Sequence, residues 1–145
     1  MVANEPNRSD YRNFLAQGLE AKIVTGLGHA QACYAYQISD FAGQSPVLVV
    51  TSRNSKRDQQ TFGANNLTTF GLDVHIFTLY SADGWTESEA ETRADLLEKE
   101  VTDWVVDNRS GTIYWNVSGE TQLGGIELGG DEYKHEVVPI TALIP

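Results

Sequence analysis

Residues 70–80 read FGLDVHIFTLY, and this stretch decides the fold of the chain. Two sets of side chains alternate along it: Phe70, Leu72, Val74, Ile76, Thr78 and Tyr80, and between them Gly71, Asp73, His75, Phe77 and Leu79. A period of two belongs to a β-strand, whose successive side chains point to opposite faces, and it does not fit a helix. We therefore predict a long strand, with His75 on the face opposite the apolar one.

Four further segments with strand character flank this stretch. Residues 32–38 (ACYAYQI) alternate, and residues 47–51 (VLVVT) are short, apolar and β-branched, as in a well-buried strand. Toward the C-terminus, residues 112–117 (TIYWNV) and 132–143 (EYKHEVVPITAL) have the same character. Together these segments predict a sheet of about five strands.

Two segments have helical spacing. The first begins at Ser9-Asp10 and is stopped by Gly26 and Gly28; its apolar positions are Tyr11, Phe14, Leu15, Leu19 and Ile23. The second begins at a capping box, residues 86–89 (TESE), and runs to about Asn108; its apolar stripe is Ala90, Ala94, Leu97, Val101, Trp104 and Val105. The predicted order is α-β-β-β-α-β-β. This is an α+β fold with two helices packed on one face of a largely antiparallel sheet.

Length and composition indicate one soluble domain spanning residues 1–145. The hydrophobic content of 41% argues against disorder, and the net charge of −10 disfavours general nucleic-acid binding, which needs clustered cations. Cys33 is the only cysteine, so an internal disulfide is impossible. The first residues lack an apolar signal segment, and the longest apolar run, residues 47–50, is too short to span a membrane. We expect synthesis in the cytosol and no membrane partner.

A long polar loop is predicted over residues 52–68 (SRNSKRDQQTFGANNLT). Compact domains rarely contain more than ~12–15 residues of structureless loop unless the loop is functional or disordered. The segment is also basic on an acidic chain, with Arg53, Lys56 and Arg57 against Asp58. We interpret these three basic residues as candidate protein contacts.

A second loop is predicted over residues 119–130 (GETQLGGIELGG), which contain five glycines. Two interpretations stay open: a flexible hairpin connection, or a loop that becomes ordered against a partner, since glycine permits close backbone approach. The candidate contacts in this segment are Gly124, Gly125, Gly129 and Gly130.

No catalytic, cofactor-binding or metal site is predicted. Cys33 lies inside a strand, the setting of an inert buried thiol. The histidines, at positions 29, 75 and 135, do not form a cluster that could supply the three or four ligands of a metal site. A nucleophile, a base and a group that orients the base cannot be named together, so we predict that the protein is not an enzyme.

The second helix is strongly acidic, with Glu87, Glu89, Glu91, Asp95, Glu98, Glu100, Asp103 and Asp107 against Arg93 and Lys99. A solvated face is the ordinary explanation, and the early acids also complement the helix dipole. A dedicated partner surface is the alternative.

The whole layout resembles one protein family. The segments that carry the resemblance are residues 11–23 (YRNFLAQGLEAKI), 32–38, 44–52 (QSPVLVVTS), 68–81 (TTFGLDVHIFTLYS), 85–108 (WTESEAETRADLLEKEVTDWVVDN) and 112–144. In the last segment a Trp-bearing strand, residues 119–130 and Tyr133-x-x-Glu136 precede an apolar strand. In this order the segments resemble the tail terminator, or tail completion, proteins of long-tailed bacteriophages.

The resemblance implies a structural virion protein rather than an enzyme, with no cofactor. Such a subunit forms a hexameric ring that caps the tail tube, ends its polymerisation and provides the surface for head attachment. The implied partners are further copies of the chain, the tail tube protein and the head–tail connector proteins, with DNA passing through the lumen without specific binding. The implied location is the tail or neck of the virion, after assembly in the host cytoplasm.

Two alternatives stay open: another neck component, such as a head-completion or connector protein, and a small cytosolic α+β ligand-binding module. A closed ring needs two different complementary patches on each subunit. Our hypothesis from the sequence is that Arg53, Lys56 and Arg57 meet the acidic second helix of a neighbouring copy.

Overall fold

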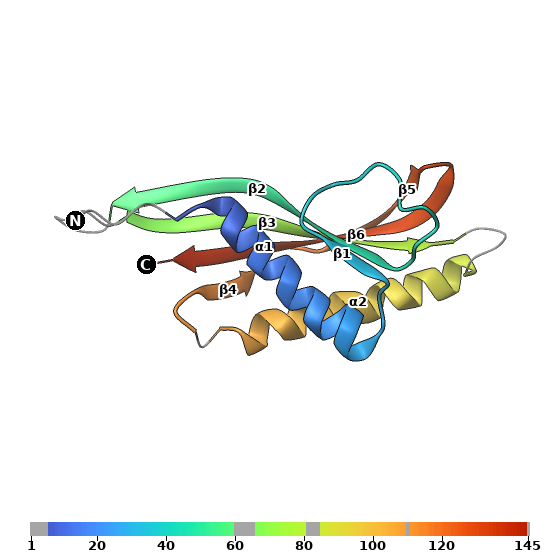
Figure 1. The fold of residues 1–145 in the computed structure, drawn as a ribbon, viewed down its shortest axis with the longest axis horizontal. Coiled ribbons are helices and arrows are strands. Elements are labelled where there is room, and N and C mark those ends of the chain that lie inside the picture. Colours follow the sequence, from blue (N-terminus) through green and yellow to red (C-terminus); the bar gives the residue numbers. More distant parts are fainter. Residues whose placement is uncertain (1–5, 60–65, 81–84, 110, 145) are drawn as a thin grey trace.

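A six-stranded sheet carries both helices on one of its faces (Figure 1). The computed structural model describes residues 6–59, 66–80, 85–109 and 111–144. Along the chain the elements are α1 (Arg8–Leu19), the π-helical segment η1 (Glu20–Leu27), β1 (Ala32–Tyr34), β2 (Val47–Gln59), β3 (Asn66–Leu79), α2 (Glu87–Asp107), β4 (Tyr114–Val117), β5 (Gln122–Leu128) and β6 (Asp131–Ile144). The predicted α+β class and the order of helices and strands are confirmed.

The sheet is largely antiparallel, as predicted, but it has one strand more than expected. Its order is β1-β2-β3-β6-β4, and β5 also pairs with β6, so there are six strands rather than about five. The β1 strand runs parallel to β2, while the other pairs are antiparallel, so the sheet is mixed. Because β3 occupies one edge of β6, β4 and β5 share the other edge, at residues 140–143 and 131–137.

The main core lies between the sheet and the helices. The alternation that predicted β3 is confirmed, because Phe70, Leu72, Val74 and Ile76 are all fully buried on the helix-bearing face. The predicted stripe of α2 meets them: Ala90, Ala94, Leu97, Val101, Trp104 and Val105 are buried. Thr86 caps α2 as predicted, since its hydroxyl accepts a hydrogen bond from the Glu89 amide at 3.2 Å.

A second, smaller core lies on the opposite face of the sheet. Phe41, Val47, Val49, Phe77 and Tyr133 form it. Phe41 belongs to the connection from β1 to β2, which lies over this face (Figure 1). The predicted strand over residues 32–38 therefore ends early, at Tyr34, because the chain leaves the sheet to cover this core. Only part of the face is covered.

The N-terminal helix begins slightly earlier than predicted and ends in a different geometry. Its N-cap is Asn7, whose side chain accepts a hydrogen bond from the Ser9 amide at 2.9 Å, so the prediction of Ser9-Asp10 as the cap is wrong. The α-helix passes into the π-helical segment η1, which contains Gly26. Gly28 ends the segment with a φ of 69°, a left-handed conformation that glycine adopts without steric cost.

The predicted loop over residues 52–68 is wrong for the described part of that segment. Residues 52–59 continue β2 and residues 66–68 begin β3, with Lys56 opposite Thr69; residues 60–65 lie outside the described residues. Strand pairing uses backbone groups, which a polar sequence supplies as well as an apolar one. The apolar pattern of β2 stops at this point because the side chains of residues 53–58 are exposed. We call residues 51–58 of β2 and 67–73 of β3 the arm.

The predicted loop over residues 119–130 is also partly strand. Residues 122–128 form β5, which pairs antiparallel with β6. The glycines obscured this strand, since they lack the side chains by which a strand is recognised.

Candidate functional site

The three basic residues predicted as protein contacts lie on the arm, but they do not form one patch. Lys56 and Arg57 are adjacent in a strand, so their side chains point to opposite faces. The Arg57 guanidinium lies 5.6 Å from the ring centre of Phe70, a residue of the helix-side core. Arg53 forms an ion pair with Asp73 on the opposite face. The cations of the arm therefore occupy both faces of the sheet.

Each of these cations also has a contact within the chain. The Lys56 Nζ lies 3.5 Å from an Asp58 carboxylate oxygen, and Arg57 donates a hydrogen bond to the Pro6 carbonyl at 2.9 Å. The side chain of Arg53 is 32% exposed and that of Lys56 is 73% exposed. Lys56 is thus the better placed of these two to reach a partner, and the contact role of all three stays a prediction.

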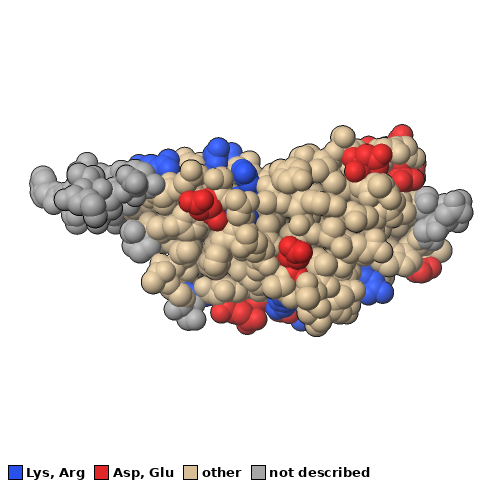
Figure 2. Space-filling view, in the orientation of Figure 1, with Lys and Arg blue, Asp and Glu red and all other residues tan. Residues whose placement is uncertain are grey.

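The first helix adds positive charge to the arm. Arg8 donates a hydrogen bond to the Ser55 hydroxyl at 3.2 Å, and Arg12 donates one to the Ser52 hydroxyl at 2.8 Å. Half of the ten basic residues of the chain therefore lie on or beside the arm: Arg8, Arg12, Arg53, Lys56 and Arg57. Figure 2 shows basic atoms gathered at this end of the elongated molecule.

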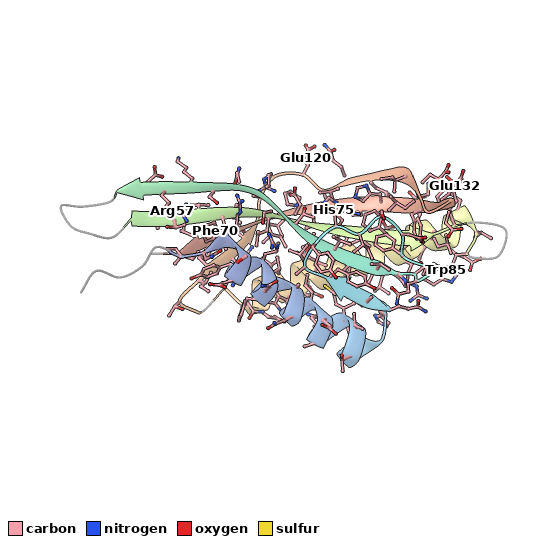
Figure 3. All side chains as sticks on the ribbon, turned by 45° about the horizontal axis from the view of Figure 1, so that its top comes forward. Arg57, Phe70, His75, Trp85, Glu120 and Glu132 are labelled. Carbon is pink, nitrogen blue, oxygen red and sulfur yellow. The ribbon has the colours of Figure 1, made fainter. Side chains whose placement is uncertain are left out.

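The opposite end of the molecule is acidic. Glu127 and Glu132 lie directly opposite each other in the β5–β6 pair, and Asp131 begins β6. No ion pair among the described residues involves any of these three acids. Figure 2 shows acidic atoms gathered over this hairpin, and Figure 3 places Arg57 and Glu132 toward opposite ends. We call Glu127, Asp131 and Glu132 the acidic end.

The four candidate glycines fall into two groups with different roles. Gly129 and Gly130 form the two-residue turn between Leu128 and Asp131, with φ values of 60° and 85°. Tight hairpin turns require such positive φ angles, so these two glycines have a structural explanation. Gly124 and Gly125 lie within β5 and are exposed, and the turn does not explain them.

Four of the eight acids of α2 contact a lysine or a histidine within the chain. Glu87 pairs with Lys134, Asp103 with Lys99 and Asp107 with Lys22, at 2.7, 2.8 and 3.6 Å, and the buried Glu100 contacts His29. Beside the helix, burial raises the pKa of Glu136, an effect that Glu98 and Asp95 reinforce. The prediction of α2 as a partner surface remains untested, and the acidic end is the less neutralised of the two acidic regions.

A pair of histidines escaped the sequence prediction. The His75 Nδ1 and the His135 Nε2 lie 2.8 Å apart on the face away from the helices, and the Thr51 hydroxyl lies 2.9 Å from the other nitrogen of His75. Burial lowers the pKa of His135 to about 4, and the neighbouring His75 adds to the effect. Burial also lowers the pKa of His75, while Asp73 opposes that shift. The alternation of apolar and polar residues in β3 and β6 places each histidine on this face. The register between the two strands, which brings the histidines together, could not be read from the sequence.

The structure holds the Cys33 thiol in its neutral form. Burial raises the pKa of the Cys33 thiol to about 12, and the Glu20 carboxylate acts in the same direction, so the thiolate nucleophile is suppressed. Within the described ranges, no group of three His, Cys, Asp or Glu side chains could hold a metal ion. Of the helices in that part of the chain, none has the length and apolar character that crossing a bilayer requires.

Comparison with known proteins shows the fold of the chain. No family model matches the chain, and no curated protein matches its sequence. Among solved structures, that of the bacteriophage SPP1 gp17 protein superposes with a TM-score of 0.52 at 11% sequence identity. The match covers 94% of this chain and 91% of the other. At this identity the likeness shows a shared fold that extends over nearly the whole of both chains.

Proposed function

We propose that the chain is a structural virion protein of a long-tailed bacteriophage, and that it forms a hexameric ring at the end of the tail tube. There it ends polymerisation of the tube and provides the surface for head attachment. The observation that carries this proposal is the fold shared with the bacteriophage SPP1 gp17 protein over 94% of the chain. The order of segments, which resembles that of tail terminator proteins, supports the same assignment.

The charge distribution of the subunit supports assembly with further copies. A heterologous contact joins two different patches, and repeated around a rotation axis it closes into a ring. The basic arm and the acidic end lie at opposite ends of the molecule and have opposite charge (Figure 2). Two complementary patches are therefore available on each subunit.

The remaining partners follow from the same proposal. The ring contacts the tail tube protein on one side and the head–tail connector proteins on the other, and DNA passes through its channel without specific binding. The net charge of −10 suits a channel to which DNA must not adhere. The protein needs no cofactor and has no enzymatic activity in this role.

Particles assembled without the protein test the proposal. A tube that lacks its terminator continues to grow, so electron microscopy of such particles should show overlong or irregular tails that carry no heads. Supplying the purified protein during assembly should restore a uniform tail length. Tails of normal length in the absence of the protein would contradict the proposal.

The same particles distinguish the alternative neck role. A terminator should be found on headless tails, where antibody labelling would place it at the head-proximal tip. A head-completion or connector protein should be found on tailless heads instead. Native mass measurement of the purified protein, with and without tail tubes, should reveal a sixfold assembly in at least one of the two samples.

A further inference from the structure

One edge of the arm has no strand beside it. The β1 strand pairs with β2 only at residues 47–49, so residues 51–58 of β2 have a strand partner on the β3 side alone among the described residues. An unpaired edge presents backbone N–H and C=O groups that can pair with another chain. A bulge between Ser52 and Asn54 and the charges of Arg53 and Lys56 make this edge unattractive to arbitrary strands. A specific partner must therefore match its charge.

The other free edge of the sheet belongs to β5. Among the described residues this strand pairs with β6 alone. A Cβ atom added at Gly124 would meet no heavy atom within 4 Å, so the surroundings of this glycine are open. A glycine at an exposed edge permits close approach of another backbone. Close approach of a partner strand would account for Gly124 and Gly125, which lie outside the hairpin turn.

The directions of the strands allow these two edges to meet. The strands β2, β3, β6 and β5 lie in this order across the sheet, and each is antiparallel to the one before. The β2 and β5 strands therefore run in opposite directions. A copy rotated about an axis roughly along the strands brings its β2 antiparallel to the β5 of its neighbour. Strand directions therefore continue to alternate across the junction between two copies.

The charges beside the two edges are complementary on each face of the sheet. On the face away from the helices, Lys56 lies at one edge and Asp131 near the other. On the helix-bearing face, Arg57 lies at one edge, and Glu127 and Glu132 lie at the other. Like charges directly opposite each other in a sheet are destabilising. The Glu127–Glu132 pair is therefore unfavourable within one subunit, and a cation from a neighbour would relieve it.

We propose that copies of this chain join by antiparallel pairing of residues 55–58 of β2 with residues 124–127 of β5 in the next copy, a register in which Arg57 and Glu127 are diagonal neighbours on the same face. The free edges lie at opposite ends of the sheet, so the paired strands are staggered along their length, as strands are in a tilted barrel. The inference rests on the proposed ring and specifies its contact: the partner is a second copy, held by backbone hydrogen bonds and by the arm cations against the acidic end.

Charge reversal and its compensation test the contact. The variant Lys56→Glu/Arg57→Glu and the variant Glu127→Lys/Glu132→Lys should each weaken self-association, by about tenfold for each contact. The variant that combines all four changes should recover most of the loss. A matched control, Lys22→Glu/Lys99→Glu, changes the net charge by the same amount as the arm variant, away from both edges, and should assemble as the unchanged protein does. Sedimentation measures association, and thermal unfolding checks that each variant is folded.

Cross-linking tests the pairing itself. In a Cys33→Ala background, Gly124→Cys is combined in turn with Asn54→Cys, Lys56→Cys and Asp58→Cys, all on the face away from the helices. A disulfide requires Cα atoms within ~7 Å, so at least one combination should give a covalent ladder of copies on oxidation. The control Gly124→Cys/Ser55→Cys places the thiols on opposite faces and should give none.

The outcomes separate this inference from the proposed function. If no combination cross-links and the charge variants assemble normally, the edge pairing is wrong, even where particles without the protein have overlong tails. If cross-links form between copies but tails without the protein have normal length, the edge pairing stands and the tail role fails.

Discussion

At the scale of single residues, one absent side chain sets the packing between α1 and α2. A Cβ atom added at Gly18 would lie 2.6 Å from the Trp104 ring, far inside van der Waals contact. That ring also meets Trp115 edge to face at 5.3 Å between centres and Phe14 at 6.3 Å. Glycine weakens a helix interior, so its presence here is explained by the space that the indole needs.

We expect Gly18→Ala to destabilise the protein. Alanine improves helix propensity by up to ~1 kcal/mol, whereas overpacking of a rigid ring costs about 1–3 kcal/mol, so the clash prevails. The free energy of unfolding from urea titration should fall by about 1–2 kcal/mol. Gly124→Ala, at a position with open surroundings, is the control and should change little. A gain in stability for Gly18→Ala would contradict this packing account.

The histidine pair should make stability depend on pH. The folded protein holds the pKa of His135 at about 4, below the ordinary value of 6.5, so the unfolded chain binds the proton more readily. The contribution of neutral His135 to the free energy of unfolding is therefore complete above pH 6.5. It is lost as the pH falls from 6.5 toward 4. The raised pKa of Glu136 acts in the opposite direction in acid.

We expect His135→Gln to flatten this pH dependence. A neutral amide keeps much of the polar contact with His75 but does not take up a proton, so the decline in the thermal midpoint below pH 6.5 should become shallower. Scanning calorimetry over that range measures it, with Glu136→Gln as the comparison that removes the opposing group. An unchanged slope in His135→Gln would show that other groups control the acid response.

At the scale of elements, the helices and buried strands were predictable and the uncovered ones were not. Apolar periodicity identified α2 and β3 because each has one face in the core. The same signal is missing from residues 53–58 of β2, whose side chains are exposed, and from β5, where glycines replace side chains. Apolar periodicity arises from the burial of one face of an element. A strand that is held by backbone hydrogen bonds alone therefore has no such periodicity in its sequence.

The candidate contacts were predictable as residues but not as a site. An unusual local composition drew attention to the basic residues and the glycines. Arg53 and Lys56 lie on one face of the sheet and Arg57 on the other. This placement depends on strand alternation and on a bulge, neither of which follows from a predicted loop. The His75–His135 contact depends on the register of β3 against β6, which no pattern in a single strand contains.

We expect the cap of α2 to contribute measurably to stability. Thr86→Ala removes the acceptor for the Glu89 amide and should lower the free energy of unfolding by about 1 kcal/mol. Thr86→Ser retains the hydroxyl and should cost much less. Urea titrations of the three proteins measure the difference. Equal stability of the alanine and serine variants would mean that solvent satisfies the amide equally well.

At the scale of the whole molecule, the main electrostatic feature is the separation of charge along its length. The net charge of −10 makes copies repel one another, whereas the basic arm and the acidic end attract each other. At 0.1 M salt the Debye length is ~10 Å, so the long-range repulsion is already screened while contacts between neighbours persist.

We therefore expect self-association to weaken as salt rises from 0.1 M to 1 M. Over this range the Debye length falls to ~3 Å, and the added screening weakens mainly the short-range attraction between the arm and the acidic end. Light scattering at a series of sodium chloride concentrations measures the effect. Association that strengthens steadily with salt would indicate an apolar contact in place of a charged one.

The alternation of β2, β3, β6 and β5 has a consequence for orientation. From one free edge to the other the sheet has four strands, and because four is an even number the two edge strands, β2 and β5, run in opposite directions. Every copy can therefore join the next in an antiparallel pair without being turned over. All copies then have the same polarity along the rotation axis, and the assembled ring has a front that differs from its back. An odd number of strands would require either a parallel junction or neighbours of opposite polarity. The parity of the sheet thus allows an assembly that can be mounted in only one direction.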